Sequence, residues 1–204
     1  MYKTISTEVI ILRKIPYSET SLIVYTLSPE YGRLDFMIRG ARQISKKALP
    51  EIDIFRKFKI EFKETGLSKN LISPLSFDLI KENDSICKYP KIIGTIYSVV
   101  AFILKNIHTG IVCEFVYSAF DKMLDLFSKG EEYPIFLIKL VYLYENGLLP
   151  NELSKSDKEE KSKKILSILI NSAVGKIAIP NLSDDYLLSL NRWVTNLSLA
   201  NELE

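Results

Sequence analysis

Positive side chains gather in one short stretch in the first half of the sequence. Between residues 33 and 59 there are eight Lys and Arg residues against three Asp and Glu residues, a net charge of +5. A polyanion drawn to such a stretch binds by counterion release, so its affinity falls steeply as salt rises. The candidate phosphate contacts are Arg33, Arg39, Arg42, Lys46, Lys47, Lys57 and Lys59. The alternative is that these cations only solvate the outer face of strands and a loop.

The charge of the whole chain does not by itself indicate a nucleic-acid ligand. Its 204 residues contain 27 Lys and Arg and 25 Asp and Glu, a net charge of +2. The distribution is uneven, because residues 1–80 have a net charge of +4 and the remainder has −2. The first part of the chain is therefore where a polyanion would bind.

Side chains that could support catalysis or hold a metal are few. His108 is the only histidine, and none of the patterns HExxH, GxSxG and GxxxxGK[ST] occurs. Cys87 and Cys113 stand far apart, so with His108 they cannot supply four convergent zinc ligands at the usual short spacings. Nothing pairs a nucleophile with a base, which makes a hydrolase or transferase the least favoured class. We expect no catalytic residue, no metal and no cofactor.

The first 80 residues have the pattern of short strands. Segments rich in β-branched and aromatic residues alternate with turn formers. In the third segment Leu34, Phe36 and Ile38 share one face, because strand side chains alternate with period two. Pro74 marks the last segment as an edge or bulged strand. The predicted strands are Val9–Ile15, Ser21–Leu27, Arg33–Arg39, Ile52–Lys63 and Leu71–Leu79.

From Tyr89 onward the apolar residues recur with helical spacing. The predicted helices are Lys91–Asn106, Val112–Phe127, Pro134–Asn146, Lys161–Val174 and Asp184–Ala200. The charged stretch 151–164 between the third and fourth is predicted to be a solvated linker or a frayed helix start. The sequence therefore predicts an α+β protein, with a small closed or partly open barrel in residues 1–80 and an all-helical domain in residues 81–204.

A five-stranded barrel binds nucleic acid by laying it across one sheet face and the flanking loops. Tyr17, Tyr25 and Tyr31 fall near the ends of the predicted strands and could stack on bases. They could equally be core or rim aromatics.

Two cysteines cannot build a disulfide framework, which favours a reducing compartment. The N-terminus lacks a small-residue cleavage site, and the longest apolar stretch, residues 92–104, is shorter than a membrane span. We expect a cytoplasmic location and no membrane association.

Four short motifs in order resemble the bacterial recombination mediator family RecO. They are residues 9–13 (VIILR), 16–20 (PYSET), 32–33 (GR) and 39–42 (RGAR). The resemblance is strong over residues 7–64 and thinner beyond, where it rests on residues 144–150 (YENGLLP). It implies an N-terminal OB-fold that carries the DNA site, a helical domain and no enzymatic turnover. It also implies binding to single- and double-stranded DNA, annealing of complementary strands, and recombinase loading together with RecR.

The sequence departs from the family pattern in two places. Many members carry a four-cysteine zinc site after the third helix, where this chain has the cysteine-free stretch 151–164, so zinc is not expected. The basic loop after Arg42 is short, with only Lys46 and Lys47 before Pro50.

Lys139 is the only charged residue in the stretch 135–144. The family's helical domain receives the acidic, apolar C-terminal tail of the single-strand-binding protein, and Lys139 could hold that tail. A lysine that snorkels to solvent is the alternative. For the whole protein, the rival to a DNA-binding mediator is an interaction adaptor whose barrel is only a scaffold.

Overall fold

The computed structural model describes residues 3–42, 51–67, 70–150 and 157–203, with the backbone alone for 157–163. The strands are β1 (Thr4–Tyr17), β2 (Ser21–Ser28), β3 (Gly32–Ile38), β4 (Lys57–Lys63) and β5 (Pro74–Lys81). The helices are α1 (Pro90–Asn106), α2 (Glu114–Ser128), α3 (Phe136–Glu145), α4 (Asp157–Ala173) and α5 (Asp184–Ala200). Two short 3-10 helices cover Glu64–Gly66 and Asp84–Lys88.

The five strands form one sheet in the order β3-β2-β1-β4-β5, with antiparallel pairing between neighbours. The sheet closes where β3 meets the chain just before β5 in parallel orientation. There the Met37 N–H donates to the Ile72 carbonyl at 2.9 Å, and the Ile72 N–H donates to the Asp35 carbonyl at 2.8 Å. The barrel is an OB-fold, so the predicted α+β fold class is confirmed.

Strand β1 is buried on both faces along residues 9–12. Val9 and Ile11 point into the barrel core, whereas Ile10 and Leu12 pack into the core of the helices. A strand covered on both faces shows a continuous apolar run instead of alternation. This explains the run VIIL, and it joins the barrel to the helical part through shared apolar contacts.

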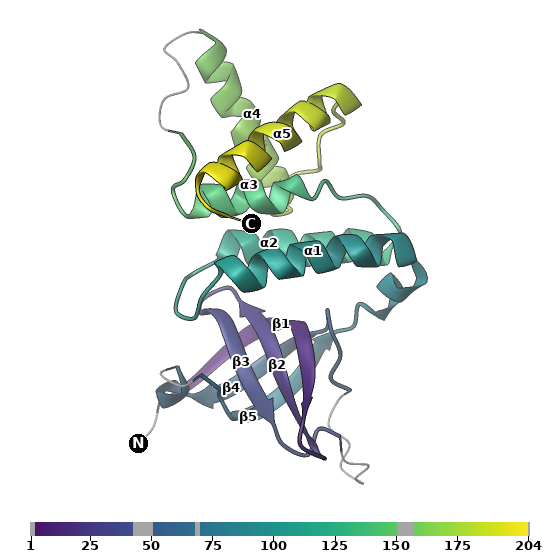
Figure 1. Cartoon of the computed structure of the whole chain (residues 1–204), viewed down its shortest axis with the longest axis vertical. Coiled ribbons are helices and arrows are strands. Elements are labelled where there is room, and N and C mark those ends of the chain that lie inside the picture. Colours follow the sequence, from purple (N-terminus) through teal and green to yellow (C-terminus); the bar gives the residue numbers. More distant parts are fainter. Residues whose placement is uncertain (1–2, 43–50, 68–69, 151–156, 204) are drawn as a thin grey trace.

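The helices stack on one end of the barrel (Figure 1). Helices α1 and α2 lie directly against it, and α3, α4 and α5 form a further layer beyond them. The helical core draws on every helix and includes the fully buried Phe120, Met123 and Leu140. No helix in the described ranges is both long and apolar enough to cross a membrane.

The predicted elements agree with the structure, and three of their bounds differ by more than three residues. Strand β1 begins at Thr4 and not at Val9. Strand β4 begins at Lys57 and not at Ile52, because Phe55 has a left-handed backbone, φ 67°, that interrupts the extended chain. Helix α4 begins at Asp157, so its backbone takes in part of the stretch predicted as a linker or frayed helix start, while residues 151–156 lie outside the described ranges. Pro74 lies in β5 at the edge of the sheet order, as predicted, beside an irregular register with β4.

Candidate nucleic-acid interface

The outer face of β1, β2 and β3 presents an aromatic ring between two guanidinium groups. Cross-strand pairing sets Arg13 opposite Tyr25, and Tyr25 opposite Asp35. The guanidinium carbons of Arg13 and Arg33 lie 5.8 and 5.6 Å from the centroid of the Tyr25 ring. Both distances are within cation–π range. The sequence singled out Tyr25 and Arg33 but not Arg13, which pairing across the sheet brings into the site.

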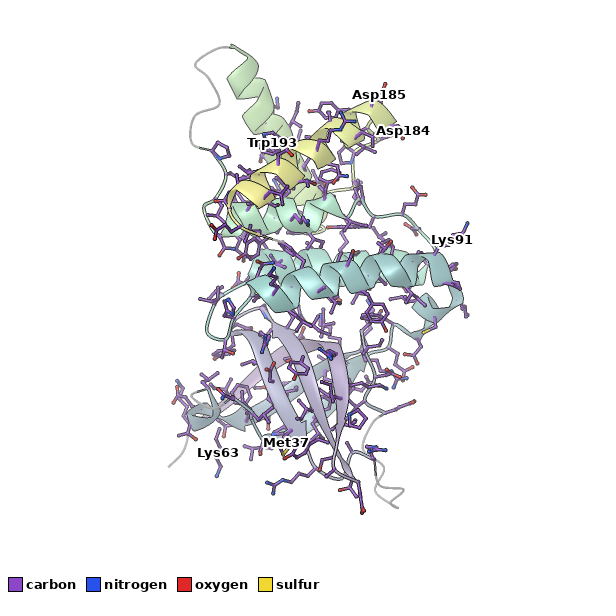
Figure 2. All side chains as sticks on the ribbon, in the orientation of Figure 1. Met37, Lys63, Lys91, Asp184, Asp185 and Trp193 are labelled. Carbon is purple, nitrogen blue, oxygen red and sulfur yellow. The ribbon has the colours of Figure 1, made fainter. Side chains whose placement is uncertain are left out.

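A row of apolar side chains continues this face. Ile15 pairs with Ile23, and Ile23 pairs with Met37 in the next strand. All three are only half-buried, because they stand on the outer surface of the barrel. Figure 2 shows Met37 in the half of the barrel remote from the helices. None of the three was singled out from the sequence, although strict alternation along β2 and β3 would have placed Ile23 and Met37 on this face.

Arg39 and Arg42 lie at the end of the barrel that carries the β1–β2 turn. Ile38, the last residue of β3, pairs with Leu22 near the start of β2. Arg39 is the next residue in the chain, so it also lies near the start of β2. The Arg42 backbone N–H donates to the Thr20 carbonyl at 3.0 Å, and its Nη1 donates to the Ser18 carbonyl at 3.1 Å. Both side chains are exposed. Within the described part of the chain, no acidic group lies at ion-pair distance from either guanidinium.

The guanidinium group of Arg33 is already engaged in hydrogen bonds within the protein. It donates two hydrogen bonds to the Asp35 carboxylate, at 3.1 and 2.9 Å, and a third to the Leu104 carbonyl of α1 at 3.2 Å. The Asp35 carboxylate offsets its charge. Arg33 therefore orients the Tyr25 ring and braces the barrel against α1, and it offers less charge to a phosphate than Arg39 or Arg42.

Lys57, one of the predicted phosphate contacts, is not an exposed cation in the structure. Its side chain is 14% exposed, and Nζ lies 3.0 Å from both Glu8 Oε2 and Asp121 Oδ2. Burial alone would lower the pKa of Lys57, but the hydrogen bonds to these two carboxylates hold that pKa above its usual value. The ammonium also lies 5.3 Å from the Tyr117 ring centroid. Lys57 thus joins β4 to α2.

The other predicted phosphate contacts do not extend the patch. Lys59 is exposed on β4, but β1 and β2 lie between β4 and β3 in the sheet. Its cross-strand neighbours are Glu8 and Asp78. Lys46 and Lys47 lie outside the described residues. The candidate cations therefore do not form one patch. Among those that the structure describes, only Arg39 and Arg42 share one end of the barrel without a described acidic partner.

The three tyrosines differ in environment. Tyr25 is half-buried on the sheet face between Arg13 and Arg33. Tyr31 packs edge-on against Phe62 of the barrel core, with ring centroids 6.3 Å apart. Tyr17 is 50% exposed at the end of β1. Tyr25 is therefore the tyrosine that is both on the sheet face and next to cations.

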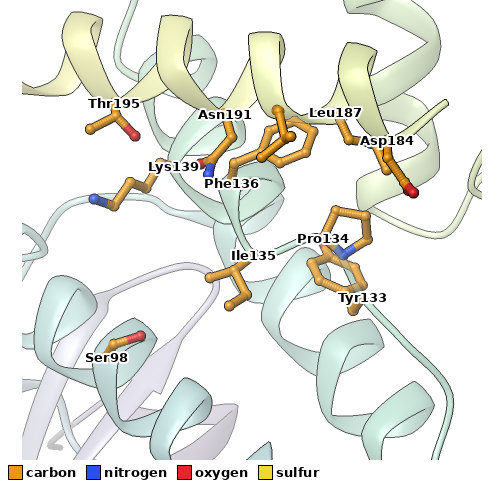
Figure 3. Close-up of a pocket in the computed structure, with 11 residues that line it drawn as sticks. Ser98, Tyr133, Pro134, Ile135, Phe136, Lys139, Asp184, Leu187, Asn191 and Thr195 are labelled. Atoms are coloured by element: carbon orange, nitrogen blue, oxygen red, sulfur yellow. The ribbon is translucent and has the colours of Figure 1, made fainter. Parts of the chain in front are cut away.

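A second candidate site lies in the helical part, around Lys139. A groove of about 710 Å³ runs between α1, the start of α3 and α5. Figure 3 shows Lys139 and Phe136 on its α3 side, facing Asn191 and Thr195 of α5. The Lys139 ammonium lies 5.5 Å from the Phe102 ring centroid, and the side chain is half-buried. No described carboxylate lies at ion-pair distance from Lys139.

Comparison with known proteins finds similarity in the barrel region. Residues 1–74 match the family described as Recombination protein O N terminal. The chain is 35% identical over 82 residues to the DNA repair protein RecO of Thermodesulfovibrio yellowstonii. That match covers 38% of this chain and spans about a third, 33%, of the relative's length. The resemblance expected from the four motifs is confirmed over this region. No group of three or more metal-ligating side chains occurs in the described ranges.

Proposed function

Because residues 1–74 match the family described as Recombination protein O N terminal, we propose that the protein is a DNA-binding mediator of recombinational repair. It binds single- and double-stranded DNA and turns over no substrate. In this proposal residues 1–80 form the nucleic-acid-binding domain and residues 81–204 the helical domain that meets partner proteins. The cytoplasmic location expected from the sequence is part of the same proposal.

One observation supports this function above the others. An OB-fold sheet face carries Tyr25 between two arginines, and Arg39 and Arg42 stand at its end without a described acidic partner. Rings stack on bases of any identity, and guanidinium groups hold phosphates without reading the sequence. Binding is therefore expected to be tolerant of sequence and sensitive to salt.

Strand annealing follows from the same chemistry. Two complementary strands repel each other through their phosphates, and cations that neutralise both backbones lower that barrier. The protein would hold strands by charge and leave the pairing edges of their bases free. We expect the protein to accelerate pairing of complementary oligonucleotides at low salt and to lose this effect as salt rises.

The binding test compares barrel arginines with a distant lysine. Fluorescence anisotropy with a labelled single strand, at several salt concentrations, is measured for Arg39→Ala, Arg42→Ala and Lys91→Ala. Lys91 is exposed on α1, away from the barrel (Figure 2). Each barrel variant should bind less tightly and lower the slope of log affinity against log salt by about 0.7 for each phosphate that is no longer neutralised. Lys91→Ala should match the parent. Unchanged affinity and slope in both barrel variants would remove these arginines from the site.

Recombinase loading with RecR is the further part of the proposal. A pull-down of purified RecR with this protein, in the presence and absence of single-stranded DNA, tests the association. The same mixture, added to DNA coated with single-strand-binding protein, tests whether the recombinase is loaded faster. Lack of loading with intact DNA binding would reduce the proposal to strand annealing.

The groove beside Lys139 supports a site for the tail of the single-strand-binding protein. Its walls include Phe136 and Leu187, and Lys139 brings a positive charge without a described acidic partner. An acidic, apolar chain end needs both features, since the carboxylates require a cation and the side chains an apolar wall.

A tail peptide is titrated against the parent, Lys139→Ala and Lys129→Ala, where Lys129 is an exposed cation beyond α2. We expect about ten-fold weaker binding for Lys139→Ala only. Equal binding by Lys139→Ala would favour a lysine that merely reaches solvent.

The same groove also favours the rival function, an interaction adaptor with a scaffold barrel. The adaptor predicts peptide or protein binding at the groove with no DNA binding at low salt. The anisotropy titration therefore separates the two functions directly.

A further inference from the structure

The seam between β3 and β5 opens into a small cavity at the end of the barrel that carries Arg39. The cavity has a volume of about 260 Å³. Its walls include the apolar side chains of Met37, Leu75 and Phe77. Arg39 stands at the same cavity. This volume lies below the range of drug-sized ligand sites and suits a single flat group.

Pro74 explains why the barrel opens here. The Met37 and Ile72 hydrogen bonds begin a parallel ladder between β3 and the chain entering β5. In a parallel ladder the next donor from that chain, two residues after Ile72, would be residue 74. Proline has no N–H, so Pro74 cannot continue the ladder. The two backbones are free to diverge beyond this point, and side chains from both strands line the space between them.

The chemistry of the walls matches a nucleobase joined to a phosphate. Leu75 is 55% exposed and offers an apolar surface at the mouth, whereas Phe77 is buried deeper. The Ser76 hydroxyl forms no hydrogen bond with any residue that the structure describes. Arg39 adds a positive charge without a described acidic partner, and Arg42 stands close by in the chain. An apolar slot beside unneutralised cations suits a flat ring on an anionic chain better than an uncharged or cationic group.

We propose that the β3–β5 seam binds one unstacked base of single-stranded DNA, which contacts Met37 and Leu75 while its phosphate meets Arg39. This inference rests on the proposed DNA-binding function and adds a specific binding site for one base. A base held in a duplex cannot enter, because it is stacked and paired on both sides. The seam would therefore favour single strands over duplex, whereas the arginines alone attract both.

The test separates base contacts from phosphate contacts. Affinities for a single strand and for an abasic strand of the same length are measured for the parent, Leu75→Ala and Ile80→Ala. Ile80 is an exposed apolar residue on the same strand but outside the cavity. The parent and Ile80→Ala should bind the normal strand about five-fold more tightly than Leu75→Ala does. On the abasic strand all three should bind alike, and on duplex DNA Leu75→Ala should equal the parent.

The outcomes distinguish this inference from the proposed function. A Leu75→Ala variant that binds the normal strand as tightly as the parent would overturn the seam as a base site and leave DNA binding intact. A strand containing 2-aminopurine gives an independent readout, since its fluorescence should change on binding to the parent and less on binding to Leu75→Ala. Absence of DNA binding by the parent at low salt would instead refute the proposed function and the seam together.

Discussion

The carboxylate of Glu145 accepts a hydrogen bond from the backbone N–H of Phe115 at 2.9 Å, so the end of α3 caps the start of α2. The other carboxylate oxygen accepts from the Val116 N–H at 3.1 Å. Helix α2 has no side-chain cap from its own N-cap residue, Cys113. A residue 30 positions along the chain therefore satisfies N–H groups that every helix start leaves without intrahelical partners.

Removal of this distant cap should destabilise the helical part. Glu145→Ala is expected to lose about 1–2 kcal/mol of unfolding free energy, the usual cost of a lost N-cap. Glu145→Gln keeps an acceptor oxygen and should lose less. Urea unfolding followed by circular dichroism measures both. An alanine variant as stable as the parent would mean that water replaces the carboxylate without cost.

The turn between β2 and β3 requires a glycine for two separate reasons. Gly32 has φ 66°, and a Cβ at this position would lie 2.3 Å from the His108 carbonyl oxygen. Gly147 has almost the same backbone angle, φ 67°, with no atom within 4 Å of its Cβ position. Gly147→Ala should therefore cost only about 1–2 kcal/mol for the left-handed backbone.

Gly32→Ala is expected to cost clearly more than Gly147→Ala, because the loop after α1 must also move. Thermal unfolding of the two variants checks this ordering. Equal losses of stability in the two variants would show that the loop moves at little cost and that the contact with the His108 carbonyl contributes little.

The Lys57 ion pairs predict a contrast between two lysines of the same strand. Lys57→Ala leaves Asp121 without its ammonium partner at a half-buried position, and we expect a loss of about 1–3 kcal/mol. Lys59→Ala removes an exposed side chain and should change stability by less than about 0.5 kcal/mol. Chemical unfolding of both variants gives the comparison. An unchanged stability for Lys57→Ala would show that the ion pairs with Glu8 and Asp121 contribute little to the free energy of unfolding.

Stability at acid pH should depend on Asp84. The Arg56 guanidinium donates to the Asp84 carboxylate at 2.9 Å, and this hydrogen bond lowers the pKa of Asp84 below its usual 3.8. A carboxylate with a lowered folded pKa contributes stability that is present above its usual pKa and lost as pH falls through the folded value. Asp84→Asn should therefore be less stable than the parent near neutral pH, with a difference that shrinks below about pH 4. A pH series of unfolding free energies tests this, and a constant difference would exclude the ion pair as its source.

The two cysteines should differ sharply in reactivity. Burial raises the pKa of the Cys113 thiol to about 12, and its Sγ lies 3.1 Å from the Ser28 carbonyl oxygen. Cys87 is exposed. A thiol reagent should label Cys87 quickly in the native protein and Cys113 only after unfolding, because the thiolate is the reactive form. Mass spectrometry of the labelled peptides identifies each site. Rapid labelling of Cys113 would mean that the contact between the barrel and the loop before α2 opens readily.

Local sequence patterns determine most of the elements. Alternation in residues 33–39 identified the buried face of β3, since Leu34 and Phe36 are fully buried and Ile38 nearly so. The predicted bounds of the last helix, Asp184–Ala200, are those observed. Period and capping act between residues a few positions apart, so one sequence is enough to show them.

The tertiary structure determines which of the basic side chains remain exposed and without an acidic partner. Arg33, Lys57 and Arg39 are equivalent basic residues in the sequence, but folding brings Asp121 to Lys57 across 64 residues of chain. Arg13 enters the interface because β1 pairs with β2, and Lys139 lines a groove because α5 returns to α3. The strands, the helices and the basic segment follow from short-range periodicity and composition, which a single sequence contains. The closed barrel, the neutralised lysine and the open seam at Pro74 depend on contacts between distant segments, and a linear pattern contains no distances between them.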